Sequence, residues 1–171
     1  MTKRILLTGR PGCGKTTLIK RIVRDLAMPA GGFYTEEIRE RSRRVGFKLI
    51  TLEGKEAVFA SVNFKTSKRV GKYGLDLNKL ETVGVSAVRE AVPARQLVVI
   101  DEIGPMKIRS ATFRDAVNEA FESSVLILAT IVARSLPFTD AIKKQSDVSL
   151  IEVRPENREQ LFVEISGRFK K

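Results

Sequence analysis

The sequence predicts an α/β fold of three layers, in which a mostly parallel central sheet lies between helices and carries an antiparallel strand meander at one edge. Three observations lead to this prediction. A glycine-rich loop joins an apolar run to an amphipathic helix, a second apolar run at residues 97–100 ends in two acidic residues, and residues 33–60 read as extended segments separated by turns. The 171 residues, 43% of them hydrophobic, suit a single domain spanning residues 1–171.

The glycine-rich loop fills every fixed position of the phosphate-binding pattern G-x-x-x-x-G-K-[ST]. It follows the short apolar run at residues 5–7 and precedes a helix with apolar residues on one face. Backbone amides of such a loop hold phosphate oxygens, Lys15 supplies an ammonium for the β- and γ-phosphates, and Thr16 is placed to ligate Mg²⁺. A plain turn before a helix is the weaker alternative. The predicted nucleotide contacts here are Gly9, Arg10, Pro11, Gly12, Cys13, Gly14, Lys15, Thr16 and Thr17.

The next part of the chain predicts the meander. Extended segments open at residue 33 and continue through an alternating run at 45–52, with an arginine-rich connection from Arg39 to Arg44 between them. Residues 63–76 are polar and have a glycine-bracketed centre at 71–74. This stretch suits either a substrate-facing loop or a surface connection. A short edge strand is expected at residues 75–77, and a helix at 84–92 that ends before Pro93.

The apolar run at residues 97–100 predicts a parallel strand that is covered on both faces. Asp101 and Glu102 follow it, at the carboxyl end of the strand, where open α/β sheets bind ligands. This is the Walker B pattern, in which Asp101 holds Mg²⁺ and Glu102 orients and deprotonates the attacking water. The alternative is an acidic pair that only caps a helix. The phosphate loop makes the Walker B interpretation the stronger one.

The C-terminal third alternates again between helices and strands. Helices are expected at residues 110–121 and 137–145, strands at 125–129 and 148–153, and a last helix after Pro155. Further candidate site residues lie at the ends of these strands. Thr130 is a candidate for a hydroxyl near the γ-phosphate, Arg134 for a catalytic cation, and Asn157 and Arg158 for contacts to the base or ribose.

Composition limits the cofactor and the location. The chain has one cysteine and no histidine, so it lacks a Cys/His set for zinc and cannot form an internal disulfide. A cytoplasmic protein without a signal segment or membrane span is expected. The net charge of +11 is compatible with nucleic acid, yet many Lys and Arg alternate with Glu and Asp as on solvated surfaces. Nucleic acid is therefore a possible but not a favoured partner, and a monomer is expected.

Several motifs together resemble one family. Beside the phosphate loop they are Gly32-Phe33-Tyr34-Thr35-Glu36-Glu37, Arg44-Val45-Gly46-Phe47, Val70-Gly71-Lys72-Tyr73-Gly74, Asp101-Glu102-Ile103-Gly104-Pro105-Met106 and Glu156-Asn157-Arg158. In this order they are similar to the THEP1-type nucleoside-triphosphatases. The resemblance implies a P-loop fold and Mg²⁺-dependent hydrolysis of ATP, GTP and other triphosphates. Lys107 replaces the acidic residue usual after Pro-Met, and Arg154 stands where Thr or Ser is often found.

Three other functions share parts of this pattern. A P-loop kinase would transfer the γ-phosphate to a small molecule, but the 131–136 connection is short for an arginine-rich lid. An RNA-linked ATPase would use the arginines of residues 39–44. A GTPase switch would use Asp101-Glu102-Ile103-Gly104 as its D-x-x-G element, but the guanine-reading N-K-x-D motif of such proteins is missing from this sequence. Broad base tolerance is expected, because the recognisable contacts go to phosphates.

Overall fold

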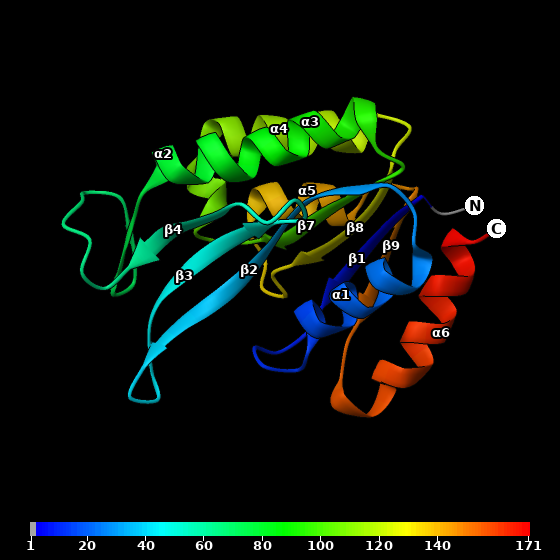
Figure 1. Ribbon diagram of the computed structural model, residues 1–171, viewed down its shortest axis with the longest axis horizontal. Coiled ribbons are helices and arrows are strands. Elements are labelled where there is room, and N and C mark those ends of the chain that lie inside the picture. The colour runs from blue at the N-terminus through cyan, green and yellow to red at the C-terminus, as the bar shows by residue number, and fades with distance from the viewer. Residues whose placement is uncertain (1–2) are drawn as a thin grey trace.

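Residues 3–171 form a nine-stranded sheet with helices on both faces, as the computed structural model in Figure 1 shows. The strand order is β5-β6-β4-β3-β2-β7-β8-β1-β9. The strands are β1 (Arg4–Thr8), β2 (Ala30–Glu40), β3 (Arg43–Thr51), β4 (Glu56–Ser61), β5 (Arg69–Val70), β6 (Tyr73–Leu75), β7 (Leu97–Ile103), β8 (Leu126–Ile131) and β9 (Val148–Glu152). The helices are α1 (Lys15–Leu26), α2 (Leu77–Lys79), α3 (Ser86–Ala94), α4 (Ala111–Glu122), α5 (Pro137–Lys143) and α6 (Arg158–Phe169), with a π-helical segment η1 (Leu80–Val85) and 3₁₀ turns η2 (Lys107–Arg109) and η3 (Pro155–Asn157).

One half of the sheet is parallel and buried. In this half β2 pairs with β7, β7 with β8, and β1 with both β8 and β9, always in parallel. Residues 97–100 of β7 are fully buried, as a strand covered by helices on both faces requires. The parallel sheet expected from the sequence is confirmed. Its strands end at one edge, which carries the phosphate loop and the acidic pair.

The other half is the predicted antiparallel meander, in which β3 pairs with β2 and β4, and β6 with β4 and β5. The β2–β3 hairpin turns through Arg41 and Ser42, which have φ angles of +46° and +67°. Positive φ at both central residues matches the twist that a two-residue hairpin needs. Residues 39–75, which we call the extension, reach one end of the long axis in Figure 1, whereas α6 lies toward the other.

The two faces of the sheet have separate cores. Helices α3, α4 and α5 cover one face, where Phe33, Val117 and Ile142 belong to a single buried cluster. Helices α1 and α6 cover the other face, with Ile19 and Ile165 in the second cluster. This is the three-layer arrangement expected from the sequence.

Two local predictions were wrong. Leu77 does not continue an edge strand: Asp76 accepts a hydrogen bond from Lys79 N at 3.0 Å and starts a helix at Leu77. Helical structure then runs through η1 into α3, so the segment begins earlier than residue 84 and includes Pro93. Pro93 lies in the last turn, where the one hydrogen bond that it removes is tolerated. Between residues 63 and 76 the chain also adds β5 and β6.

Within residues 3–171, none of the helices combines the length and the apolar character needed to cross a membrane.

Candidate functional site

The phosphate loop adopts a backbone that favours glycine at three positions, of which the first and the last are fixed in the motif. Gly9, Gly12 and Gly14 have φ angles of +147°, +79° and +94°. A Cβ at Gly9 would lie 2.5 Å from the carbonyl oxygen of Val153, and one at Gly14 would lie 2.5 Å from Nη1 of Arg158. The loop is therefore packed against the connection between β9 and α6. Arg158, predicted from the sequence to contact the nucleotide, lies directly against the loop.

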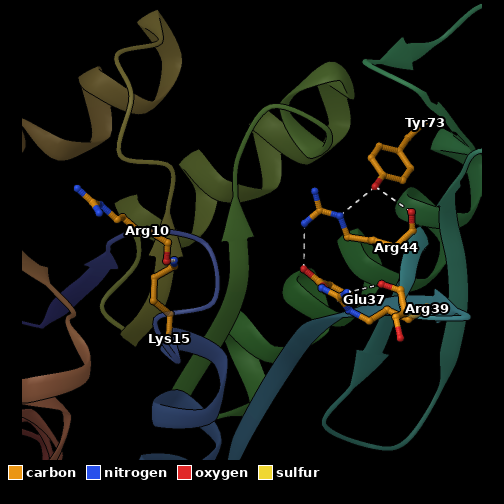
Figure 2. A network of polar contacts seen from close by, with 7 residues as sticks. Arg10, Lys15, Glu37, Arg39, Arg44 and Tyr73 are labelled. Atoms are coloured by element: carbon orange, nitrogen blue, oxygen red, sulfur yellow. Dashed lines mark hydrogen bonds and ion pairs between the residues drawn. The ribbon is translucent and has the colours of Figure 1, made fainter.

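Lys15 lies within the same loop. Its Nζ donates hydrogen bonds to the carbonyl oxygens of Gly9 at 2.9 Å and Arg10 at 3.1 Å. Figure 2 shows Lys15 and Arg10 on the loop, apart from a second polar network on the extension. Lys15 begins α1, so its ammonium stands where the N-terminal amides of the helix also carry partial positive charge.

The Asp101 carboxylate is buried and accepts three hydrogen bonds. It is 3% exposed, and its Oδ2 accepts a hydrogen bond from the Thr16 hydroxyl at 2.7 Å. Oδ1 accepts from the Thr130 hydroxyl at 2.7 Å, and Oδ2 also accepts from the Thr35 backbone N–H at 3.2 Å. The phosphate loop, β2, β7 and β8 thus meet at one carboxylate. The sequence predicted that Thr16 and Asp101 bind the same metal ion, and in the structure a hydrogen bond joins their side chains.

Two further residues contact Asp101. Thr130, predicted from the sequence as a hydroxyl near the γ-phosphate, donates to Asp101 Oδ1 at 2.7 Å, and its position near the γ-phosphate stays a prediction. Thr35 was not singled out for the site, although its backbone N–H contacts the Asp101 carboxylate and its hydroxyl donates to the Asp101 carbonyl. Its position in the Gly-Phe-Tyr-Thr-Glu-Glu motif was the available signal.

Glu102 is half-buried next to the anchored aspartate, and its side chain folds over Gly104. A Cβ at Gly104 would lie 2.5 Å from Oε1 of Glu102 and 3.1 Å from its Cδ. Glycine at this position therefore leaves the space that the carboxylate occupies. A side chain at Gly104, the glycine of the Asp-Glu-Ile-Gly motif, would therefore clash with Glu102, the candidate general base.

Lys107 is a buried cation beyond the acidic pair. Its side chain is 4% exposed, and its Nζ lies 4.8 Å from the ring centre of Phe59 and 5.7 Å from that of Phe33. Burial lowers the pKa of the Lys107 ammonium to about 8, and the negative charges of Glu102 and Asp101 limit that decrease. Sequence reasoning identified Lys107 as a departure from the family pattern but did not predict its burial.

The remaining predicted site residues have different surroundings. Arg134 is exposed between β8 and α5. Both polar atoms of the Asn157 amide are used within the turn before α6: Oδ1 accepts from Arg154 N at 2.8 Å, and Nδ2 donates to Glu152 O at 3.0 Å. Roles for Arg134 and Asn157 in nucleotide binding stay predictions.

A second polar network joins Glu37 of β2 to the extension and brings together three of the sequence motifs (Figure 2). The Arg44 guanidinium donates to the Tyr73 hydroxyl at 2.9 Å and to the Glu37 carboxylate at 3.0 Å. Arg39 donates to the other oxygen of Glu37 at 2.9 Å. Arg44 also stacks on Phe47, with 5.2 Å between its Cζ and the ring centre. The network fixes the hairpin to β6.

The oxygen donors at Thr16 and Asp101 fit a divalent metal ion. They are hard ligands held 2.7 Å apart, the type that Mg²⁺ uses together with waters and substrate phosphates. Residues 3–171 contain no group of three or more His, Cys, Asp or Glu side chains suited to hold a metal by themselves. The donor set therefore matches a metal that arrives with a phosphate ligand.

Comparison with protein families matches residues 4–166 to a family described as NTPase. Nucleoside-triphosphatase THEP1 of Thermotoga maritima is 46% identical over 167 residues, which cover 98% of this chain and 95% of that protein. The protein of the same name from Thermofilum pendens is 44% identical over 165 residues, covering 93% and 91%.

Two solved structures have the same fold. The crystal structure of THEP1 from Aquifex aeolicus superposes with a TM-score of 0.89 at 39% identity and covers 98% of this chain and 99% of that one. The solution structure of a human cancer-related nucleoside triphosphatase gives a TM-score of 0.83 at 35% identity, covering 97% and 96%.

Proposed function

This chain belongs to the nucleoside-triphosphatase family, and we propose that it hydrolyses nucleoside 5′-triphosphates, ATP and GTP among them, to the diphosphate and phosphate. The observation that carries the proposal is the 2.7 Å hydrogen bond between the Thr16 hydroxyl and Asp101, which unites the phosphate loop and the Walker B strand in one site. Mg²⁺ is the proposed metal. When bound, it would neutralise phosphate charge and polarise the transferred phosphoryl group.

Each part of the site has a distinct role in this proposal. The loop amides and Lys15 bind the phosphate tail, and Lys15 exchanges the carbonyls of Gly9 and Arg10 for phosphate oxygens. Arg158, which lies against Gly14, adds positive charge at the same loop. Thr16 and Asp101 are the proposed metal ligands. Arg134 remains the candidate cation for charge that develops on the transferred group.

Glu102 is the proposed general base. It accepts a proton from the attacking water, whose oxygen forms a bond to the γ-phosphorus while the bond from that phosphorus to the β-phosphate oxygen breaks. The diphosphate leaves with the electron pair of the broken bond. Hydrolysis is favoured over transfer to another acceptor, because the connection from β8 to α5 spans only residues 132–136 and is short for a lid.

Glu102→Gln tests the proposal, because it keeps the size of the side chain and removes the proton acceptor. We expect kcat for ATP to fall by about 10²–10⁴-fold while Mg²⁺-nucleotide affinity changes little. Glu36→Gln is the matched control, since Glu36 forms an ion pair with Lys20 at 2.5 Å and is not assigned to the reaction. Turnover of Glu102→Gln within a few-fold of wild type would show that another group is the base.

A cytoplasmic location and a monomeric state are part of the same proposal. The single Cys13 lies within the phosphate loop, where a disulfide to another chain would distort the nucleotide site. A reducing compartment is therefore the compatible one.

A further inference from the structure

Positive charge is concentrated in the extension. Residues 39–72 contain ten Lys and Arg but three Asp and Glu, a net charge of +7 out of +11 for the whole chain. The acidic residues are Glu40, Glu53 and Glu56, of which Glu53 pairs with Arg95 and Glu56 with Lys48. One fifth of the chain thus holds most of its excess charge. None of these residues has a role in the hydrolysis proposed above.

Five exposed basic residues occupy the far end of the extension, and none forms an ion pair with a residue in 3–171. We call them the distal basic end: Arg41, Arg43, Lys65, Lys68 and Lys72. The β2–β3 hairpin and the β4–β6 loops that carry them lie at the same end of the long axis in Figure 1. The hydrogen bond from Arg44 to Tyr73 connects strand β3 of the hairpin to strand β6.

A hollow of about 660 Å³ opens at the β4–β6 loops, and Lys65 and Lys68 of the distal basic end line it. Its apolar lining is Phe64, Leu75 and Leu77, and its polar lining is Asn63, Lys65, Thr66, Lys68 and Asp76. The volume is within the range of small-ligand sites. Phe64 is half-buried and lines the hollow. The hollow therefore combines a flat aromatic group with two lysine ammonium groups and a side-chain amide.

The loop that forms the hollow is fixed although it has no regular secondary structure. Phe64 N donates to Ser61 O at 3.3 Å, and Leu75 N donates to Lys68 O at 2.8 Å. Arg69 donates to the carbonyl oxygens of Phe64 at 2.9 Å and Lys72 at 2.7 Å. A Cβ at Gly74 would lie 2.4 Å from Phe64 O, so the loop packs closely on β6. A fixed loop loses little conformational entropy when it binds.

We propose that the distal basic end and the hollow bind a single strand of nucleic acid, with an unpaired base against Phe64 and the backbone phosphates at the five cations. Aromatic stacking with a flanking basic surface is how proteins bind single strands. A duplex would use the cations but keeps its bases stacked away from Phe64. An anionic membrane is disfavoured, because the exposed large apolar residues in 3–171 are Leu150 and Val163, on β9 and α6.

The test is fluorescence anisotropy with a labelled oligouridine, the full chain and a salt series from about 50 to 200 mM KCl. Five phosphate contacts predict a slope of log K against log salt of about −3.5, at about −0.7 per phosphate for single strands. Oligodeoxythymidine should bind comparably, since the proposed contacts do not require the 2′-hydroxyl. A duplex of equal length and phosphatidylserine vesicles should bind at least about tenfold more weakly.

Variants separate stacking from charge. Lys65→Gln with Lys68→Gln should reduce the magnitude of the slope by about 1.4, whereas Phe64→Leu should lower affinity roughly fivefold or more without changing the slope. Lys144→Gln with Lys171→Gln removes two exposed cations elsewhere and should bind like wild type. Lys15→Ala should also keep oligonucleotide affinity, which distinguishes this surface from the phosphate loop.

Three results would overturn the proposal: no binding at the lowest salt, duplex or vesicle binding as tight as single-strand binding, or a distal variant that behaves like the Lys144/Lys171 control. The melting temperature of each variant identifies any misfolded protein, and basal ATP hydrolysis does so for every variant except Lys15→Ala, whose side chain belongs to the proposed phosphate site. If the Lys65/Lys68 variant misfolded, Lys72→Gln, in the exposed turn between β5 and β6, would give the same charge test. Oligonucleotide binding is measured without turnover, so it does not depend on the proposed hydrolase activity.

Discussion

Lys107 has the most unusual environment of any charged residue described in the structure. Its ammonium is buried between aromatic rings and is attracted by Glu102 and Asp101 without an ion pair at contact distance in residues 3–171. The folded-state pKa of about 8 lies below the ordinary value of 10.5. Between these two values the unfolded chain binds more protons than the folded chain, so stability rises with pH in that window.

Lys107→Met should therefore stabilise the protein at neutral pH. The pKa difference of Lys107 corresponds to a loss of about 3 kcal/mol in the free energy of unfolding. This loss is fully present below pH 8 and disappears by about pH 10.5. Urea unfolding should show a large increase in the free energy of unfolding of the variant at pH 7 and a small increase at pH 10. Exposed Lys144→Met is the control and should show neither. A less stable Lys107→Met at pH 7 would mean that attraction to the two carboxylates exceeds the desolvation penalty.

Gly104→Ala tests whether the position of Glu102 matters for the reaction. The added Cβ would meet Oε1 of Glu102 at 2.5 Å, so the carboxylate must turn away. We expect kcat to fall by about 10²-fold with nucleotide affinity unchanged, since a displacement of about 1 Å has effects of this size. Steady-state kinetics and nucleotide titration measure the two quantities.

Gly167→Ala serves as the control for Gly104→Ala, because a Cβ there meets nothing within 4 Å. It should leave kcat unchanged. Equal loss of kcat in both variants would argue against a specific effect on Glu102.

At the level of elements, three strands and the phosphate loop are held together at Asp101. Thr130 of β8 donates to this carboxylate from a fully buried position. Thr130→Val keeps the shape and removes the donor, and we expect a loss of about 1.5–3 kcal/mol in the free energy of unfolding, as for hydrogen bonds to charged groups. Chemical denaturation measures it.

Thr139→Val is matched to Thr130→Val. Thr139 is equally buried, but its hydroxyl donates to the neutral carbonyl of Leu136 at 3.1 Å. The expected loss is about 1 kcal/mol. If Thr130→Val were no more harmful than Thr139→Val, the Thr130 hydrogen bond would contribute little to holding Asp101.

Elements with strong local patterns could be predicted from the sequence. The phosphate loop, β7 and the meander were predicted because their spacing and apolar runs are local properties. The contact between Thr35 and Asp101 could not be predicted, because it joins residues 66 positions apart and depends on the pairing of β2 with β7. The helical run through Pro93 was missed because the packing of α3 against β2 and β7 outweighs the low helix propensity of proline.

At the level of the whole molecule, the phosphate loop is proposed to bind the triphosphate group, which all nucleoside triphosphates share. ATP, GTP, CTP and UTP should therefore have affinities within about tenfold of one another, or roughly 1.4 kcal/mol. Competition against one fluorescent nucleotide in the presence of Mg²⁺ measures all four under the same conditions. A preference above a thousandfold for one base would show a base-reading contact that the sequence motifs do not reveal.

The strand order also has a consequence for synthesis. Strand β1 is made first, yet its neighbours β8 and β9 are the last strands of the chain. At about 5–20 residues per second, a ribosome needs on the order of ten seconds to reach β8. During that interval the three fully buried residues Ile5, Leu6 and Leu7 have no strand beside them. The meander of the nascent chain can form early. The nucleotide site is complete only when Val153 and Arg158, which pack against the phosphate loop, have left the exit tunnel.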